Sequence, residues 1–271
     1  MPLTFKTQGE AVFAELLDSR NLSYEYEKSY PSKNNVPDFT LDFVTPNVIA
    51  EVRDVDLNPE DEDIVARLSA VHTASWVQDK PYHRLRRMIH EKADQLKDYT
   101  EFPILIVLYK NSQNLTVDLS SRSIFESMFG DHVVTVHTEP TGKVVTESTF
   151  DIKNAALGLN RNKHISAIAV VENFQPHKDL ASRITKKHFK DGGNAMTEKG
   201  QEELTALFDA ERKKGIDFDL NVLRLRIVHN VFANKPLEMG IMASIYDEEM
   251  FYDKNLQKAR MHRNGVVTDY Q

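Results

Sequence analysis

Two carboxylates in neighbouring strand-like runs are the residues of this sequence best placed to do chemistry. Asp38 lies at the start of PDFTLDF, and Glu51 follows thirteen residues later in NVIAEVR. If the two runs pair as a hairpin, both carboxylates converge on one point. Two carboxylates and a nearby main-chain carbonyl suit a hard divalent cation such as Mg²⁺, with water and a phosphate oxygen completing its shell. Because such an ion polarises phosphorus and lowers the pKa of a bound water, this pattern indicates metal-dependent phosphodiester hydrolysis.

The sequence around the two carboxylates predicts the required hairpin. In residues 37–43, aromatic and aliphatic residues alternate with polar ones, which is typical of a strand with one buried face. Residues 47–53 follow a turn-forming Thr-Pro-Asn, so we expect them to complete the hairpin. Glu51 and Arg53 are two apart in this extended segment and therefore share one face.

Predicted helices lie on either side of this hairpin in the sequence. Residues 7–19 carry an apolar stripe, and Thr7 and Glu10 have the spacing of a capping box. Residues 81–99 begin with proline and repeat apolar residues at helical spacing. Residues 102–109, FPILIVLY, are apolar on both faces, as a strand in the middle of a sheet should be. This order of elements predicts an α/β fold.

The rest of the chain adds strands and one inserted segment. We expect further strands at 132–138, 143–149, 164–174 and 221–230, the first two as a hairpin. The lysine-rich region 176–219 contains a helix predicted from about 197 to 214, ending near a glycine. Because a strand resumes after it, we expect one domain over residues 1–271 with 176–219 as a helical insertion. Residues 57–80 are compatible with either a helix or a long loop.

Composition narrows the class of protein. The chain has 271 residues, 41% of them hydrophobic and 28% charged, and a net charge of -7, which argues against a surface designed as a whole to coat nucleic acid. Zero cysteines exclude disulfides, thiolate nucleophiles and cysteine-ligated metals, and fit a reducing compartment. No apolar run reaches membrane-spanning length, and the first residues lack a signal-peptide pattern. We therefore expect a cytoplasmic protein with no membrane partner.

The residues Pro37-Asp38 and Glu51-Val52-Arg53 resemble the motif of the PD-(D/E)XK nuclease superfamily, which includes restriction endonucleases and archaeal Holliday-junction resolvases. The resemblance implies a restriction-endonuclease-like α/β sandwich with a central mixed sheet, and a Mg²⁺-dependent nuclease that hydrolyses phosphodiester bonds. It further implies that Asp38, Glu51 and the Val52 carbonyl hold the metal, with Mn²⁺ as an alternative to Mg²⁺.

Further positions within residues 7–110 match this family. Glu15, in the first predicted helix, is placed to match the family's helical glutamate, which would bind a second ion or a metal-bound water. Glu10 fits less well because the capping box already engages it. Gln95 and Tyr99 look like the QLxxY element of RecB-type nucleases and share one helical face. The resemblance implies that Gln95 orients substrate or water.

Arg53 departs from the family pattern, which has lysine at this position. Arginine stays protonated, so it cannot act as a general base. It can still hold the scissile phosphate and stabilise the charge that develops there. Two functions therefore stay open: an active nuclease, or a catalytically silent nuclease-like subunit that binds nucleic acid or an assembly. A third interpretation is an interaction protein of unrelated α/β fold, in which these charges form surface pairs.

Basic residues near the expected site predict contacts with nucleic acid. We expect Arg84, Arg87 and Lys92, with Tyr99, to bind nucleic acid, because phosphate contacts supply much of the affinity in such complexes. DNA is favoured over RNA. A second basic cluster lies at 186–190, within the inserted region. A homo-oligomer or a larger nucleic-acid-processing or phage-defence complex would be a natural setting for such a chain.

Overall fold

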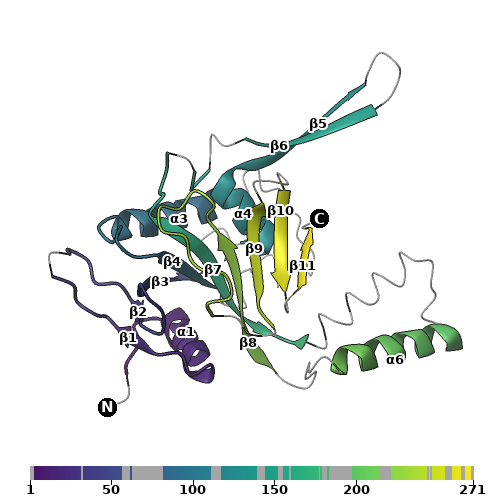
Figure 1. Cartoon of the computed structure of the whole chain (residues 1–271), viewed down its shortest axis with the longest axis horizontal. Coiled ribbons are helices and arrows are strands. Elements are labelled where there is room, and N and C mark those ends of the chain that lie inside the picture. Colours follow the sequence, from purple (N-terminus) through teal and green to yellow (C-terminus); the bar gives the residue numbers. More distant parts are fainter. Residues whose placement is uncertain are drawn as a thin grey trace.

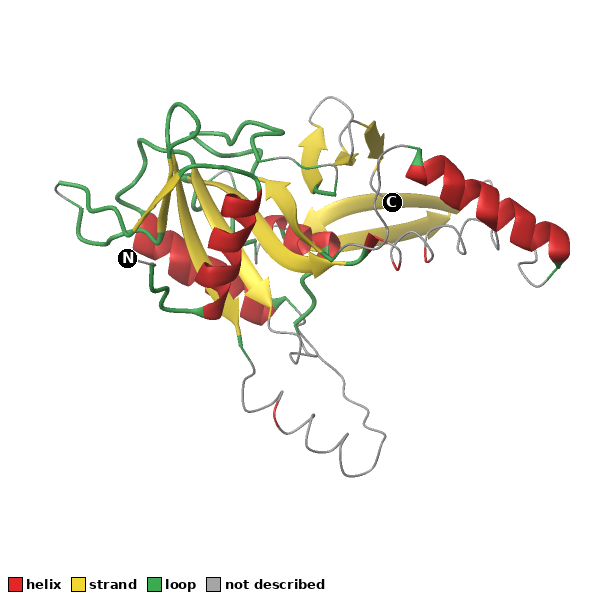
Figure 2. Cartoon of the chain, turned by 90° about the horizontal axis from the view of Figure 1, so that it is seen from below, coloured by secondary structure: helices red, strands yellow, loops and turns green. Residues whose placement is uncertain are grey.

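The computed structural model describes most of the chain, with several gaps. The described residues are 3–31, 33–56, 62, 82–110, 117–138, 144–151, 155–158, 160–176, 178, 182, 197–213, 221–242, 244, 246–253, 258–263 and 266–269. Within them, the fold is an α/β arrangement of one nine-stranded mixed sheet, a separate two-stranded sheet and four helices (Figures 1 and 2). No helix among these residues is long and apolar enough to cross a bilayer.

The helices and strands have the following bounds. In chain order they are α1 (Gln8–Ser19), β1 (Tyr24–Tyr26), β2 (Phe39–Leu41), β3 (Val48–Val55), α3 (His83–Leu96), β4 (Ile104–Lys110), α4 (Ser121–Phe129), β5 (Asp131–Thr138), β6 (Val144–Asp151), β7 (Ile165–Phe174), α6 (Glu198–Arg212), β8 (Val222–His229), β9 (Glu248–Asp253), β10 (Lys258–Arg263) and β11 (Val266–Asp269).

The main sheet has the order β1-β2-β3-β4-β7-β8-β9-β10-β11. Strands β3, β4 and β7 are parallel and form its centre, whereas β1, β2 and β3 are antiparallel neighbours at one end. β8 is antiparallel to β7 and parallel to β9. The predicted hairpin of residues 37–53 is confirmed, and β3 joins it to the parallel centre of the sheet.

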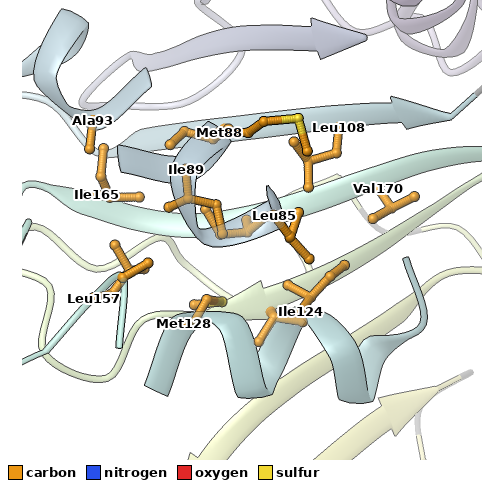
Figure 3. Packing of buried hydrophobic residues seen from close by; sticks show 14 of the residues in the cluster. Leu85, Met88, Ile89, Ala93, Leu108, Ile124, Met128, Leu157, Ile165 and Val170 are labelled. Carbon is orange, nitrogen blue, oxygen red and sulfur yellow. The ribbon is translucent and has the colours of Figure 1, made fainter. Parts of the chain in front are cut away.

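Two apolar cores cover the two faces of this sheet. On one face, α1 packs against Leu105 and Val107 of β4. On the other face, α3 and α4 pack against Ile106 and Leu108 of the same strand. Figure 3 shows this second core, where side chains of α3 and α4 meet those of β4 and β7. β4 is apolar at nearly every position because alternate residues enter different cores.

Helix α1 is attached at both ends. At its start, the Asp54 carboxylate accepts hydrogen bonds from the Gly9 N–H at 3.0 Å and from the Thr7 hydroxyl at 3.1 Å. A carboxylate at a helix N-terminus is favourable because it satisfies free N–H groups and faces the positive end of the helix dipole. At the other end, Arg20 forms an ion pair with the buried Asp247 at 2.5 Å. These contacts fix α1 on the sheet beside β3.

Most predicted elements are found close to their expected bounds, but some details differ. The 37–43 run forms only the three-residue strand β2, and Thr40, a polar residue of the alternating pattern, is fully buried, with its hydroxyl 3.0 Å from that of Tyr30. After residue 230, where no strand was predicted, β9 to β11 widen the sheet.

Two predicted segments lie largely outside the described residues. These are 57–80, of which only Glu62 is described, and 176–219, where α6 supports the predicted helix and lies away from the sheet in both views (Figures 1 and 2). The basic cluster at 186–190 also falls outside the described part of the chain.

Candidate active site

Asp38 and Glu51 meet where β2 begins. The register pairs Phe39 with Ala50, so Asp38 and Glu51 are the next opposed positions along the hairpin. The Asp38 N–H donates to Glu51 Oε2 at 3.3 Å, and the Val52 N–H donates to Asp38 Oδ2 at 2.8 Å. Asp38 is 9% exposed and Glu51 only 1%. The predicted convergence of the two carboxylates is therefore confirmed.

Helix α3 brings two polar side chains to the same carboxylate. Lys92 Nζ donates to Glu51 Oε1 at 2.6 Å, and Gln95 Nε2 donates to the same oxygen at 2.7 Å. Lys92 Nζ also lies 3.3 Å from Gln95 Oε1. Gln95 thus faces the site as predicted. Lys92, predicted to bind nucleic acid, is the cation paired with Glu51.

The apolar stripe of α3 explains why these two side chains reach β3. Leu85, Ile89, Ala93 and Leu96 are buried against the sheet. Lys92 and Gln95 border this stripe and are three residues apart, so they lie one above the other on one side of the helix. Burial of the stripe orients that side toward Glu51.

Burial and a neighbouring carboxylate disfavour the ionised form of Asp38. Burial, and to a smaller extent the negative charge of Glu51, raise the pKa of Asp38 from 3.8 to about 7, against the opposing effects of the Val52 N–H and Lys92. Glu10 adds a smaller increase. Lys92 therefore offsets only part of the rise in the pKa of Asp38 that burial and the neighbouring carboxylates cause.

Glu10, rather than Glu15, is the glutamate of α1 that faces the site. Glu15 is exposed, whereas Glu10 is buried and close enough to Asp38 to raise its pKa. The Glu10 carboxylate accepts hydrogen bonds from the Tyr26 hydroxyl at 2.5 Å and from the Lys6 N–H at 2.8 Å. The structure therefore does not bring Glu15 to the other site residues. Glu10 could have been identified because it continues the apolar stripe, three residues before Phe13.

The capping box engages Glu10 less than the sequence suggested. Thr7 Oγ1 accepts the Glu10 N–H at 3.2 Å, as the motif predicts. In place of the reciprocal bond of the motif, the Glu10 carboxylate accepts the backbone N–H of Lys6, one residue before the N-cap Thr7. Capping therefore leaves the Glu10 side chain directed toward Tyr26 and the region of Asp38.

Arg53 does not occupy the position expected of the motif residue. Its side chain is 45% exposed, and its NH2 lies 3.8 Å from Glu91 Oε2 on α3. The strand carries Arg53 past the point where Lys92 reaches Glu51, so the helix supplies the cation at the carboxylates. That Arg53 holds the scissile phosphate stays a prediction, with its guanidinium paired to Glu91 in this structure.

The predicted nucleic-acid contacts have different positions in the fold. Tyr99 is fully buried, and its hydroxyl donates to the Asn35 carbonyl. Direct contact of Tyr99 with nucleic acid is therefore wrong for this structure; the tyrosine supports the segment that leads into Asp38. Arg84 donates to the Asp56 carbonyl. Arg87 is exposed, and its Nε lies 3.6 Å from Glu91 Oε1.

The donor set fits a hard divalent cation. Asp38 and Glu51 offer carboxylate oxygens, which Mg²⁺ prefers. The N–H and C=O of one strand residue point to the same side, so the Val52 carbonyl points toward the edge where its N–H meets Asp38. A bound cation would also favour the ionised form of Asp38, which burial and Glu51 disfavour. Across the described part of the chain, no group of three or more acidic or histidine side chains is arranged to hold a metal.

Comparisons of the chain with protein-family models, with curated proteins and with solved structures found no match. The resemblance to the PD-(D/E)XK superfamily therefore stands on the residue pattern and on the geometry around Glu51.

Proposed function

We propose that this chain is a Mg²⁺-dependent nuclease of the PD-(D/E)XK type, with a restriction-endonuclease-like fold. The observation that carries the proposal is the group around Glu51: a buried glutamate opposite Asp38, bound by Lys92 and Gln95 from the following helix. The arrangement of α1 on one face of the sheet and α3 on the other supports the proposed fold. Hydrolysis of DNA is favoured over that of RNA.

The side chains divide the proposed work between them. Asp38, Glu51 and the Val52 carbonyl would hold Mg²⁺ or Mn²⁺. The ion would polarise the phosphate and lower the pKa of a bound water. Lys92 takes the place of the motif lysine and stabilises negative charge on the phosphate oxygens. Gln95 orients Glu51 and the water. The water oxygen bonds to phosphorus while the bond from phosphorus to the leaving sugar oxygen breaks, giving a phosphomonoester and a hydroxyl.

The test is cleavage of labelled single-stranded and duplex DNA and RNA with Mg²⁺ or Mn²⁺. We expect the wild type to cut, and Asp38→Asn and Glu51→Gln to lose about 100-fold or more in rate. Asp94→Asn is the matched control, because Asp94 is exposed on α3 and shares no contact with Glu51. If the wild type cuts none of these substrates, or if Asp38→Asn cuts as well as wild type, the proposal fails.

One observation favours a second candidate, a catalytically silent module that binds nucleic acid. Glu51 Oε1 already accepts two hydrogen bonds, and Oε2 accepts the Asp38 N–H, so the network satisfies Glu51 without a metal. A silent module would show no gain in thermal stability with Mg²⁺ or Mn²⁺, because a ligand stabilises only when it binds the folded state. It would bind oligonucleotides equally well in EDTA and in Mg²⁺.

A further inference from the structure

Two exposed arginines converge on one exposed glutamate beside the candidate site. Arg53 NH2 lies 3.8 Å from Glu91 Oε2, and Arg87 Nε lies 3.6 Å from Glu91 Oε1. The three side chains are 45%, 66% and 53% exposed for Arg53, Arg87 and Glu91 respectively. Among the residues described on either side of the gaps, these pairs are the sole interactions of the two guanidinium groups. Each oxygen of Glu91 thus faces a different arginine.

This cluster lies next to the carboxylates along the line where β3 meets α3. The contacts between the two elements run in opposite order: Gln95 and Lys92 meet Glu51, Glu91 meets Arg53, and Arg84 meets the Asp56 carbonyl. Arg53 is two residues from Glu51 on the same face of β3, and Glu91 directly precedes Lys92. A strand of nucleic acid that has its phosphate at Lys92 and follows this line would pass Arg53 and Arg87 next.

We infer that Arg53 and Arg87 form a binding site for a second phosphate of the nucleic acid, the one neighbouring the scissile phosphate. Glu91 occupies this site in the free protein and gives it up when nucleic acid binds. The inference deepens the proposed function and rests on its claim that the site receives nucleic acid.

The geometry of the pairs supports an exchange of anions. Charge-assisted hydrogen bonds between a guanidinium and an oxyanion are normally about 2.7–2.9 Å long, and both pairs here are longer. Exposed ion pairs are weak because water and salt screen them. A phosphodiester presents two non-bridging oxygens that share one negative charge, in the fork geometry that arginine binds best, and its binding releases counterions from the nucleic acid. Phosphate therefore competes well with Glu91.

The simpler alternative is that Glu91 only stabilises the packing of α3 on β3 and does not occupy a phosphate site. This alternative predicts that Glu91→Gln lowers the midpoint of thermal unfolding and leaves nucleic-acid binding unchanged. Our inference predicts that Glu91→Gln tightens nucleic-acid binding and leaves the midpoint of thermal unfolding unchanged. Asp94→Asn serves as the matched control, because it removes one negative charge from the exposed side of the same helix without touching Arg53 or Arg87.

The experiment measures binding of a fluorescent single strand of about 20 nucleotides and of its duplex by anisotropy, in EDTA so that no cleavage occurs. We expect Glu91→Gln to tighten binding about three-fold or more, and Asp94→Asn by less than about two-fold. Arg53→Ala and Arg87→Ala should each weaken binding and each reduce the salt slope of log K by about one. In a protein that already carries Arg53→Ala and Arg87→Ala, adding Glu91→Gln should tighten binding no more than Asp94→Asn does.

Binding and cleavage together separate the second phosphate site from the nuclease activity. Equal effects of Glu91→Gln and Asp94→Asn overturn the inference, and so does the absence of binding to either oligonucleotide. Tightening by Glu91→Gln in a protein that never cleaves supports the inference and rejects the nuclease proposal. Cleavage that depends on Asp38, together with no effect of Glu91→Gln on binding, supports the nuclease and rejects the second phosphate site.

Discussion

Lys92 Nζ lies 2.6 Å from Glu51 Oε1, so the cation at the candidate site comes from α3 and not from the strand that carries Glu51. The side chain of Lys92 is 15% exposed, whereas that of Arg53 is 45% exposed. The sequence has arginine at the position where the PD-(D/E)XK motif has lysine. In the fold, Lys92 lies at the carboxylates, whereas Arg53 lies in the exposed cluster with Glu91.

The first prediction separates these two cations by kinetics. Lys92→Ala should lower kcat about 100-fold, because charge stabilisation at the reacting phosphate is lost. Arg53→Ala should mainly raise KM, because it removes binding common to substrate and transition state. Lys97→Ala is the control and should match wild type, because Lys97 is an exposed lysine just after α3. A loss of kcat in Arg53→Ala with full activity in Lys92→Ala would reverse the assignment.

The second prediction concerns stability against pH. With its pKa raised from 3.8 to about 7, Asp38 holds a proton in the folded protein, but not in the unfolded chain, between these values. The folded state therefore binds more protons in this window, and the free energy of unfolding falls as pH rises from about 4 through about 7.

Asp38→Asn should remove this pH dependence and stabilise the metal-free protein at pH 8 by on the order of 2–4 kcal/mol. Urea denaturation at several pH values measures the effect. Parallel curves for wild type and Asp38→Asn would show that Asp38 does not have a raised pKa.

The third prediction links the same carboxyl group to metal binding. Mg²⁺ needs Asp38 ionised, so binding should release a proton below about pH 7, and the affinity should fall as the pH is lowered. Calorimetry in two buffers of different ionisation enthalpy measures the number of protons released. Asp38→Asn should lose both the binding and the proton release, while Asp94→Asn keeps both. Metal binding that is independent of pH between about 5 and 8 would contradict the site.

The fourth prediction tests which glutamate of α1 acts on the site. Glu10→Gln should lower the pKa of Asp38, because Glu10 contributes to raising it, and should shift the pH profile of activity to lower pH. Glu15→Gln should leave the profile unchanged, because Glu15 is exposed on another side of the helix. Initial-rate profiles of both variants across pH provide the measurement; a shift confined to Glu15→Gln would restore Glu15 as the relevant residue.

The fifth prediction concerns the attachment of α1. A Cβ on Gly9 would lie 2.1 Å from Asp54 Oδ1 and 2.9 Å from Tyr109 Cβ, so Gly9→Ala must displace the helix start. We expect a loss of about 1–3 kcal/mol in the free energy of unfolding. Gly158→Ala is the control, because a Cβ there meets nothing within 4 Å. Equal stability of the two variants in urea denaturation would show that the helix start adapts without cost.

Local patterns determined much of the fold. Alternation in 37–43 and the turn after it predicted the hairpin, and the apolar run at 102–109 predicted a central strand that enters both cores. These predictions succeed because strand and helix periods decide which side chains share a face, whatever the rest of the chain does. The meeting of Asp38 and Glu51 followed from hairpin pairing alone. Likewise, Gln95 reached the site because helical spacing kept it on the predicted face.

Tertiary packing decided which charges complete the site. The sequence allows either Lys92 or Arg53 to approach Glu51, but the distance between β3 and α3, and the rotation of α3 about its axis, determine which of them reaches it. The same holds for Glu10 and Glu15, since the docking of α1 through Gly9 selects the buried glutamate. Sequence determines the faces of each element, and packing between elements, driven by burial of apolar stripes, determines which faces meet.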